Sequence, residues 1–227
     1  MPIIDVNSDN LVDVGLENPQ RGLNMEAFIV SLKNAKNLKK LSITRDWITS
    51  ISKYLEDELP SIKTLILGAN NGSNVNNSLE DLSGIEKMKN LEELNVFNTT
   101  KSLNVEKIGK CEKLKYINLR NCNIKDISGL EFLNNSIQII LSNNNISSLK
   151  PLENLNNLTE LNLENNTISD TASYIDSNGN VKTYNNLEIL ANLNKNGKLK
   201  KLYLSGNDNI VNWTPLSSLN WTEKSGW

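Results

Sequence analysis

A repeated spacing of leucine and asparagine is the feature of this chain that most limits its fold. Residues 158–168 read Leu-Thr-Glu-Leu-Asn-Leu-Glu-Asn-Asn-Thr-Ile, which matches the pattern L-x-x-L-x-L-x-x-N-x-I at every fixed position. The same frame begins at seven places, spaced by 24, 29, 23, 22, 22 and 41 residues: Leu38, Ile62, Leu91, Leu114, Ser136, Leu158 and Leu199. Such a period indicates stacked repeats, because one unit cannot bury its apolar side alone.

Each repeat predicts one short strand and one outer turn. The alternating leucines of L-x-L would point inward, and strands of successive coils would pair in parallel about 4.8 Å apart. After the asparagine, an apolar residue recurs at about every third position, as in the segment 146–158 that contains Pro151. This spacing favours 3₁₀ turns over long α-helices on the outer side.

A polar position follows each Leu-x-Leu segment and is expected to face the core. It is occupied by Asn70, Cys122, Asn144, Asn166 and Asn207, whereas Asp46 and Thr99 replace asparagine in two irregular units. An inward amide can satisfy backbone groups where the chain turns away from the strand. We therefore assign this column a structural role.

Residues 114–168 resemble the 22-residue units of internalin-type and SDS22-like leucine-rich-repeat proteins, including the run N-x-I-x-x-L-x-P-L-x-x-L at 144–155. The resemblance implies a right-handed α/β horseshoe whose parallel sheet binds protein partners on its concave face. In the internalin-type family it also implies bacterial surface display or secretion. The expected parts are an N-terminal cap with a helix (1–36), a solenoid of about seven coils (37–220) and a C-terminal tail (221–227).

Two segments depart from the repeat. Residues 24–32 predict a helix with Asn24 as N-cap, lying over the first coil. The long interval holds an insertion, 169–198, which predicts a β-hairpin closed by Asn178-Gly179 and then a short helix. The insertion is either a loop beside the binding face or a neutral decoration, and the sequence leaves both interpretations open.

The chain offers few residues for catalysis. It contains no histidine, so imidazole-based triads and metal sites cannot form. Cys111 and Cys122 are expected to be buried thiols rather than a disulfide. The spacing Asp176-x-Asn178-x-Asn180 is that of a calcium loop, but valine and leucine occupy the sixth and twelfth positions. We predict a protein without catalytic residues, metal or cofactor, unless carboxylates with shifted pKa values cluster beside the hairpin.

Charge and surface pattern favour a protein partner. The chain has 24 basic and 26 acidic residues, its lysines form no continuous basic track, and no apolar run is long enough to span a bilayer. These features argue against nucleic-acid binding and membrane insertion. On the concave face we predict a binding patch of aromatic, arginine, aliphatic and amide side chains: Phe97, Tyr116, Asn118, Arg120, Ile140 and Tyr203. Aromatic residues and arginine are enriched at interface hot spots.

The sequence thus predicts a monomeric, non-enzymatic recognition module that is secreted or displayed on the cell surface. The alternative is a cytoplasmic scaffold or regulator of the SDS22-like kind.

Overall fold

The computed structural model describes residues 12–17, 25–32, 35–44, 50–52, 59–68 and 78–226. Three residues to which the sequence assigns a position, Asn24, Asp46 and Asn70, lie outside these ranges.

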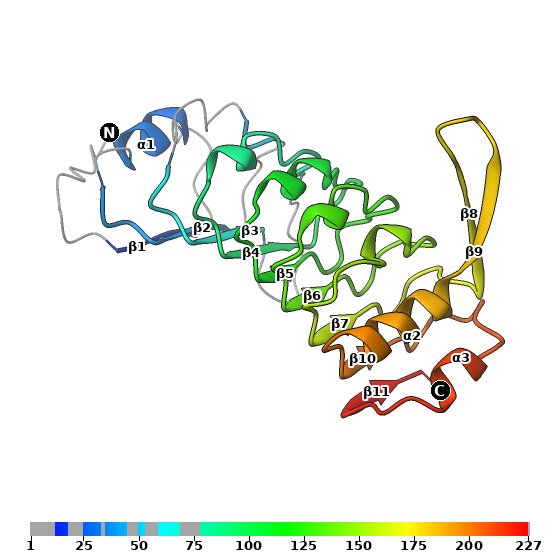
Figure 1. The fold of residues 1–227 in the computed structure, drawn as a ribbon. Helices are drawn as coiled ribbons and strands as arrows, with labels where there is room; N and C mark the ends of the chain where they lie inside the picture. Colours follow the sequence, from blue (N-terminus) through cyan, green and yellow to red (C-terminus); the bar gives the residue numbers. More distant parts are fainter. Residues whose placement is uncertain are drawn as a thin grey trace.

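One parallel sheet of nine strands lines the inner, concave side of a curved stack of coils (Figure 1). In spatial order its strands are β1 (Asp13–Glu17), β2 (Lys40–Thr44), β3 (Thr64–Gly68), β4 (Glu93–Phe97), β5 (Tyr116–Asn118), β6 (Gln138–Ile140), β7 (Glu160–Asn162), β10 (Lys201–Tyr203) and β11 (Glu223–Ser225). Neighbouring strands pair in register, so equivalent residues of successive coils form straight rows. The predicted leucine-rich-repeat solenoid is confirmed.

The inward rows form the core. One row contains Leu41, Leu65, Leu94, Ile117, Ile139, Leu161 and Leu202, all buried. Full burial of each such side chain contributes about 1.5–3 kcal/mol relative to exposure. Because each leucine packs between its equivalents in the two adjacent coils, this stabilisation depends on the stack as a whole.

Short 3₁₀ turns cover the outer side, as the three-residue apolar spacing predicts. They are η1 (Ile85–Lys87), η2 (Glu106–Lys110), η3 (Leu130–Phe132) and η4 (Lys150–Leu152). Each turn buries an apolar residue against the core, for example Ile85 in η1 and Leu130 in η3.

The sheet has two more strands than the seven coils expected from the Leu-x-Leu frames. Strand β1 lies within the segment predicted as a cap, and its Val14 pairs with Leu41. Strand β11 lies within the predicted tail, and its Lys224 stands in register with Leu202. An end strand has a neighbour on one side only, so it can form without a full repeat motif, and neither of these strands carries one. A charged residue at a sheet edge also discourages further pairing. The two boundaries between the three expected parts remain predictions.

The other elements lie at the two ends of the stack. Helix α1 (Met25–Leu32) buries Phe28, Ile29 and Leu32. The long interval between β7 and β10 contains the antiparallel hairpin β8 (Thr171–Ile175) and β9 (Val181–Asn185), followed by α2 (Asn186–Asn196). The short helix α3 (Thr214–Ser217) lies beside α2.

Buried asparagines connect each coil to the one before it. The Oδ1 atom of Asn144 accepts hydrogen bonds from the backbone N–H groups of Cys122 and Ile124, both at 3.0 Å. Its Nδ2 donates to the carbonyl oxygens of Leu119 and Leu141. Asn166 and Asn207 make equivalent bonds in the next two coils, and Cys122 donates its thiol to the Val96 carbonyl instead. These amides satisfy loop backbone that would otherwise be buried without partners.

A second column of asparagines, not anticipated from the sequence, precedes the buried one. These residues adopt left-handed backbone conformations with φ between 53° and 58°: Asn98, Asn121, Asn143 and Asn165. Asn121 donates to Asn98, and Asn165 donates to Asn143, so these bonds join neighbouring coils in two pairs. Gly206 takes this position in the following coil, where a Cβ atom would lie 2.2 Å from Oδ1 of Asn165. Asparagine tolerates this conformation better than most residues.

We predict that Asn144→Ala lowers the free energy of unfolding by about 3 kcal/mol, because the substitution leaves buried N–H groups of two residues without acceptors. Urea denaturation followed by circular dichroism measures the change. The control is Asn145→Ala, which alters an exposed neighbour and should cost less than about 0.5 kcal/mol. Equal losses in the two variants would contradict the role assigned to the buried amide.

Candidate functional site

Three rows of side chains face out of the concave sheet. The first row is Lys40, Thr64, Glu93, Tyr116, Gln138, Glu160, Lys201 and Glu223. The second row is Ser42, Ile66, Asn95, Asn118, Ile140, Asn162, Tyr203 and Ser225. A third row at the carboxyl ends of the strands includes Gly68, Phe97, Arg120, Ser142, Glu164 and Ser205, of which Gly68 and Ser142 are buried. Backbone bonds such as Asn98 N to Arg120 O, at 3.2 Å, align this row.

The structure brings five of the six predicted patch residues onto three neighbouring coils. Phe97 ends β4 and is half-buried, while Arg120 is exposed in the adjacent coil. Tyr116 on β5 is 45% exposed. Asn118 on β5 stands directly opposite Ile140 on β6. These five residues together are called the central patch below. It combines aromatic, aliphatic and cationic side chains on one hydrogen-bonded surface.

Tyr203, the sixth predicted residue, lies apart from the central patch. Asn162 of β7 stands between it and Ile140 in the second row. Its hydroxyl donates a hydrogen bond to Glu223, which together with burial raises the pKa of Tyr203 to about 12. Lys201 lies 3.4 Å from the same carboxylate. Tyr203 therefore belongs to a polar cluster that joins β10 to β11, and the sequence could not show this because β11 has no repeat motif.

Two residues beside the central patch were not among the predicted ones. Ile66 lies in the second row on β3, two strands from Asn118. Gly68 stands in register with Phe97, so no side chain lies beside the phenylalanine ring at that position of β3. Isoleucine occurs twice in one outward column, at Ile66 and Ile140, so the sequence alone could have indicated Ile66 as a patch residue. The effect of Gly68 emerges only when the strands are in register.

Ion pairs link three successive coils just before the N-terminal ends of their strands. Glu92 accepts from Lys63 at 2.6 Å and from Lys115 at 2.9 Å, and these charged hydrogen bonds lower its pKa to about 2. Its carboxylate therefore links the two flanking coils.

The described residues offer little support for catalysis. Among them, no three cysteine, aspartate or glutamate side chains converge on a possible metal site. Cys111 and Cys122 are free and buried, and burial raises the pKa of each thiol to about 12. Beside the hairpin turn, the backbone N–H of Asn180 lowers the pKa of Asp176, which stabilises the turn.

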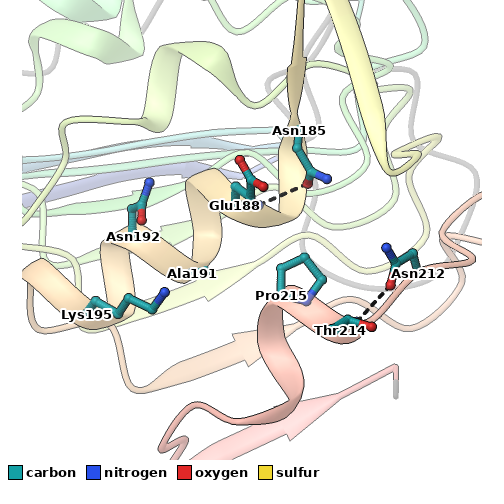
Figure 2. A pocket seen from close by; sticks show the side chains of 8 residues that line it. All are labelled: Asn185, Glu188, Ala191, Asn192, Lys195, Asn212, Thr214 and Pro215. Atoms are coloured by element: carbon teal, nitrogen blue, oxygen red, sulfur yellow. Dashed lines mark hydrogen bonds between the residues drawn. The ribbon is translucent and has the colours of Figure 1, made fainter.

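A polar groove of about 350 Å³ lies between α2 and α3 (Figure 2). Its lining consists mainly of amides and charged groups: Asn185, Glu188, Ala191, Asn192, Lys195, Asn212, Thr214 and Pro215. The Oδ1 atom of Asn185 caps α2 by accepting from Leu187 N and Glu188 N. The lining includes one carboxylate, Glu188, and one ammonium group, Lys195, beside three amides, so it has the character of a hydrogen-bonding surface.

Comparison with solved structures places this geometry among bacterial leucine-rich-repeat proteins. The chain is similar to internalin C2 of Listeria monocytogenes, with a TM-score of 0.65 and 26% identity over 86% of this chain and 74% of that one. It is also similar to an internalin, inlF, from the same bacterium (TM-score 0.61, 20% identity, 87% of this chain and 56% of that one). A leucine-rich-repeat protein of Leptospira interrogans gives a TM-score of 0.58 at 20% identity, over 90% of this chain and 49% of that one.

No family model and no curated protein sequence matches the chain. The chain has a leucine-rich-repeat solenoid fold similar to that of these bacterial internalins, and the predicted resemblance is confirmed at that level. Within the described ranges, no helix has the length and apolar character needed to cross a bilayer.

We predict a pH-dependent stability from Glu92. Its pKa is depressed below the ordinary value of 4.5, so the stabilisation is complete above about pH 5 and is lost as the pH falls toward 2. Glu92→Gln should therefore lower the Tm at pH 7, and the difference from the wild type should vanish near pH 2. Thermal unfolding across this range measures the effect.

The matched control is Glu112→Gln, which removes an exposed carboxylate nearby and should leave the Tm at pH 7 unchanged. A Glu92→Gln difference that persists at pH 2 would refute the assignment.

Proposed function

We propose that this chain is a non-enzymatic recognition module that binds a protein through its concave face, with the central patch as the main contact. The observation that carries the proposal is the gathering of Phe97, Tyr116 and Arg120 on two adjacent coils of a rigid sheet. The outward rows do not belong to the core, so the repeat does not fix which residue types stand there. Tyrosine, phenylalanine and arginine are the residue types enriched at the centres of protein interfaces.

The dimensions of the face fit a folded partner. Nine strands at about 4.8 Å span about 40 Å, which is enough for an interface of about 800 Å² per partner. Such an area is large for a small metabolite. A continuous hydrogen-bonded sheet also positions its side chains before binding, which reduces the entropic cost of association.

The charges around the central patch favour a polar, specific contact. Glu93 lies in the first row beside Tyr116, and its carboxylate accepts from Asn95 Nδ2 at 2.8 Å. Further along the sheet, Glu160 lies 3.9 Å from Lys201. Acidic groups thus lie on both sides of the central patch, and basic groups lie within it at Arg120 and beyond it at Lys201. Such a mixture selects among partners more than it attracts any one sign of charge.

The internalin-like fold supports a secreted or surface-displayed protein that acts in adhesion or recognition. We infer that the chain works as a monomer without a cofactor, since recognition through a preformed face requires neither a second copy nor a reactive group.

We predict that Phe97→Ala combined with Arg120→Ala abolishes partner capture without changing the Tm. Immobilised wild type and variant are incubated with the same extract of candidate host or bacterial proteins, and the bound proteins are quantified by mass spectrometry. A partner retained by the wild type should be depleted at least about tenfold in the variant, equivalent to 1.4 kcal/mol.

The control is Phe132→Ala with Lys125→Ala, which removes one exposed aromatic and one exposed cation from outside the concave face. This variant should retain the partner. If the control and the concave-face variant lose the same proteins, or neither loses any, the central patch is not the binding site.

A further inference from the structure

The hairpin β8–β9 forms a separate two-stranded sheet that stands out from the stack near its C-terminal end (Figure 1). It lengthens the coil between β7 and β10 beyond the regular 22 residues, whereas α2 completes that coil on its outer side. Of the hairpin side chains, Tyr184 packs against the core, whereas Ile175 and Val181 near the turn are exposed.

The base of the hairpin is fixed to the body. The hydroxyl groups of Tyr184 and Ser148 share a hydrogen bond. The ammonium of Lys150 lies 5.6 Å from the ring centre of Tyr174 and 6.0 Å from that of Tyr184. Asp170, directly before β8, accepts from the backbone N–H groups of Val211 and Asn212. An isolated two-stranded hairpin is marginally stable in water, so these contacts hold it in a defined position.

The pattern of hydrogen bonds between β8 and β9 leaves the outer edge of β8, the edge that faces away from β9, unpaired. Asp176 N donates to Asn180 O at 2.9 Å, and this pair sets which residues bond across the hairpin. In an antiparallel pair the bonded residues alternate, so Tyr174 bonds to β9, while Ser173 and Ile175 direct their N–H and C=O groups outward. Within the described part of the chain, these outward groups have no hydrogen-bond partner.

The side chains of Ile175 and Val181 share one face of the hairpin, and both are exposed and uncharged. Ile175 is 72% exposed and Val181, its cross-strand partner, is 70% exposed. The hairpin carries one acidic and one basic residue, Asp176 and Lys182, which lie 3.9 Å apart and neutralise each other. Proteins commonly protect sheet edges with lysine, proline or a bulge, and β8 contains none of these.

We propose that the outer edge of β8 binds an extended, uncharged peptide segment of a partner protein by strand addition. The segment bonds to the main chain of Ser173 and Ile175, and one of its apolar side chains packs on Ile175 and Val181. Main-chain bonding supplies affinity in this mode, and alternate side chains supply specificity. This site goes beyond the concave-face proposal and does not depend on it.

The size of the β8 edge and the charge of the hairpin indicate which kind of partner binds there. A five-residue edge offers far less than the about 800 Å² per partner that stable association of two folded chains needs, which argues against a second copy of this chain. The polar turn 176–180 extends past Ile175 and Val181, so the apolar pair would not enter a bilayer first. The absence of net charge on the hairpin matches an uncharged segment.

The test uses a fluorescein-labelled peptide of about seven residues, alternating valine and threonine, with blocked ends, and measures its fluorescence anisotropy on adding the full chain. The wild type should bind it saturably. Ser173→Pro removes an N–H from the outer edge of β8 and should weaken binding at least about tenfold. The matched control, Thr183→Pro, removes the equivalent N–H from the outer edge of β9 and should bind as the wild type does. Ile175→Lys, which keeps the backbone intact, should also weaken binding.

Circular dichroism should show an unchanged Tm for each variant, since the hairpin lies outside the stack. The variant Phe97→Ala with Arg120→Ala should retain peptide binding, so failure of either proposal can be recognised separately. No peptide binding by the wild type, or equal weakening by the two proline variants, would overturn strand addition at β8. Binding to neutral phosphatidylcholine vesicles that is lost in Ile175→Lys, without peptide binding, would overturn it in favour of a lipid contact.

Discussion

The hydrogen bond from a loop N–H of one coil to the buried asparagine carbonyl of the next is the interaction on which the rest of the structure depends. Ile124, Ile146 and Ile168 donate to Asn144, Asn166 and Asn207, respectively, at 3.0–3.1 Å. Without these acceptors, each loop N–H would be buried without a partner, at a cost of about 1–3 kcal/mol. The strands could then not stay in register, and the outward rows that form the central patch would lose their alignment.

This dependence separates structural positions from positions free to carry function. The inward rows are aliphatic, and the buried column is asparagine except where Thr99 and Cys122 replace it, so these positions carry little information about a partner. Tyr116 and Arg120 occupy outward positions that the stack does not constrain. The hairpin shows the same separation in the long coil: Tyr184 fixes it to the body, whereas Ile175 remains exposed. The two proposed binding surfaces thus lie where the repeat imposes no residue type.

The sequence predicts most of the fold because the spacing of the leucines repeats once per coil, as the stacking of the coils requires. It identifies the strands from β2 to β10 within the sheet and the outer 3₁₀ turns, since each needs apolar residues at fixed spacing. It does not reveal β11, whose pairing needs only backbone groups. Nor does it reveal the left-handed column of Asn98 and Asn143, because exposed asparagines in loops have many possible roles. For the candidate site, the sequence gives the column positions, but it does not reveal the hydrogen bond from Tyr203 to Glu223, because β11 has no repeat motif.

Hydrogen–deuterium exchange of individual amides, resolved by NMR, tests the central interaction most directly. The N–H groups of Ile124, Ile146 and Ile168 lie after their strands, where an ordinary loop would exchange rapidly. If each is bonded to a buried asparagine, it should exchange as slowly as the N–H groups of the strand residues Ile117 and Ile139. Exchange as fast as that of Ser173, on the open edge of the hairpin, would contradict the account.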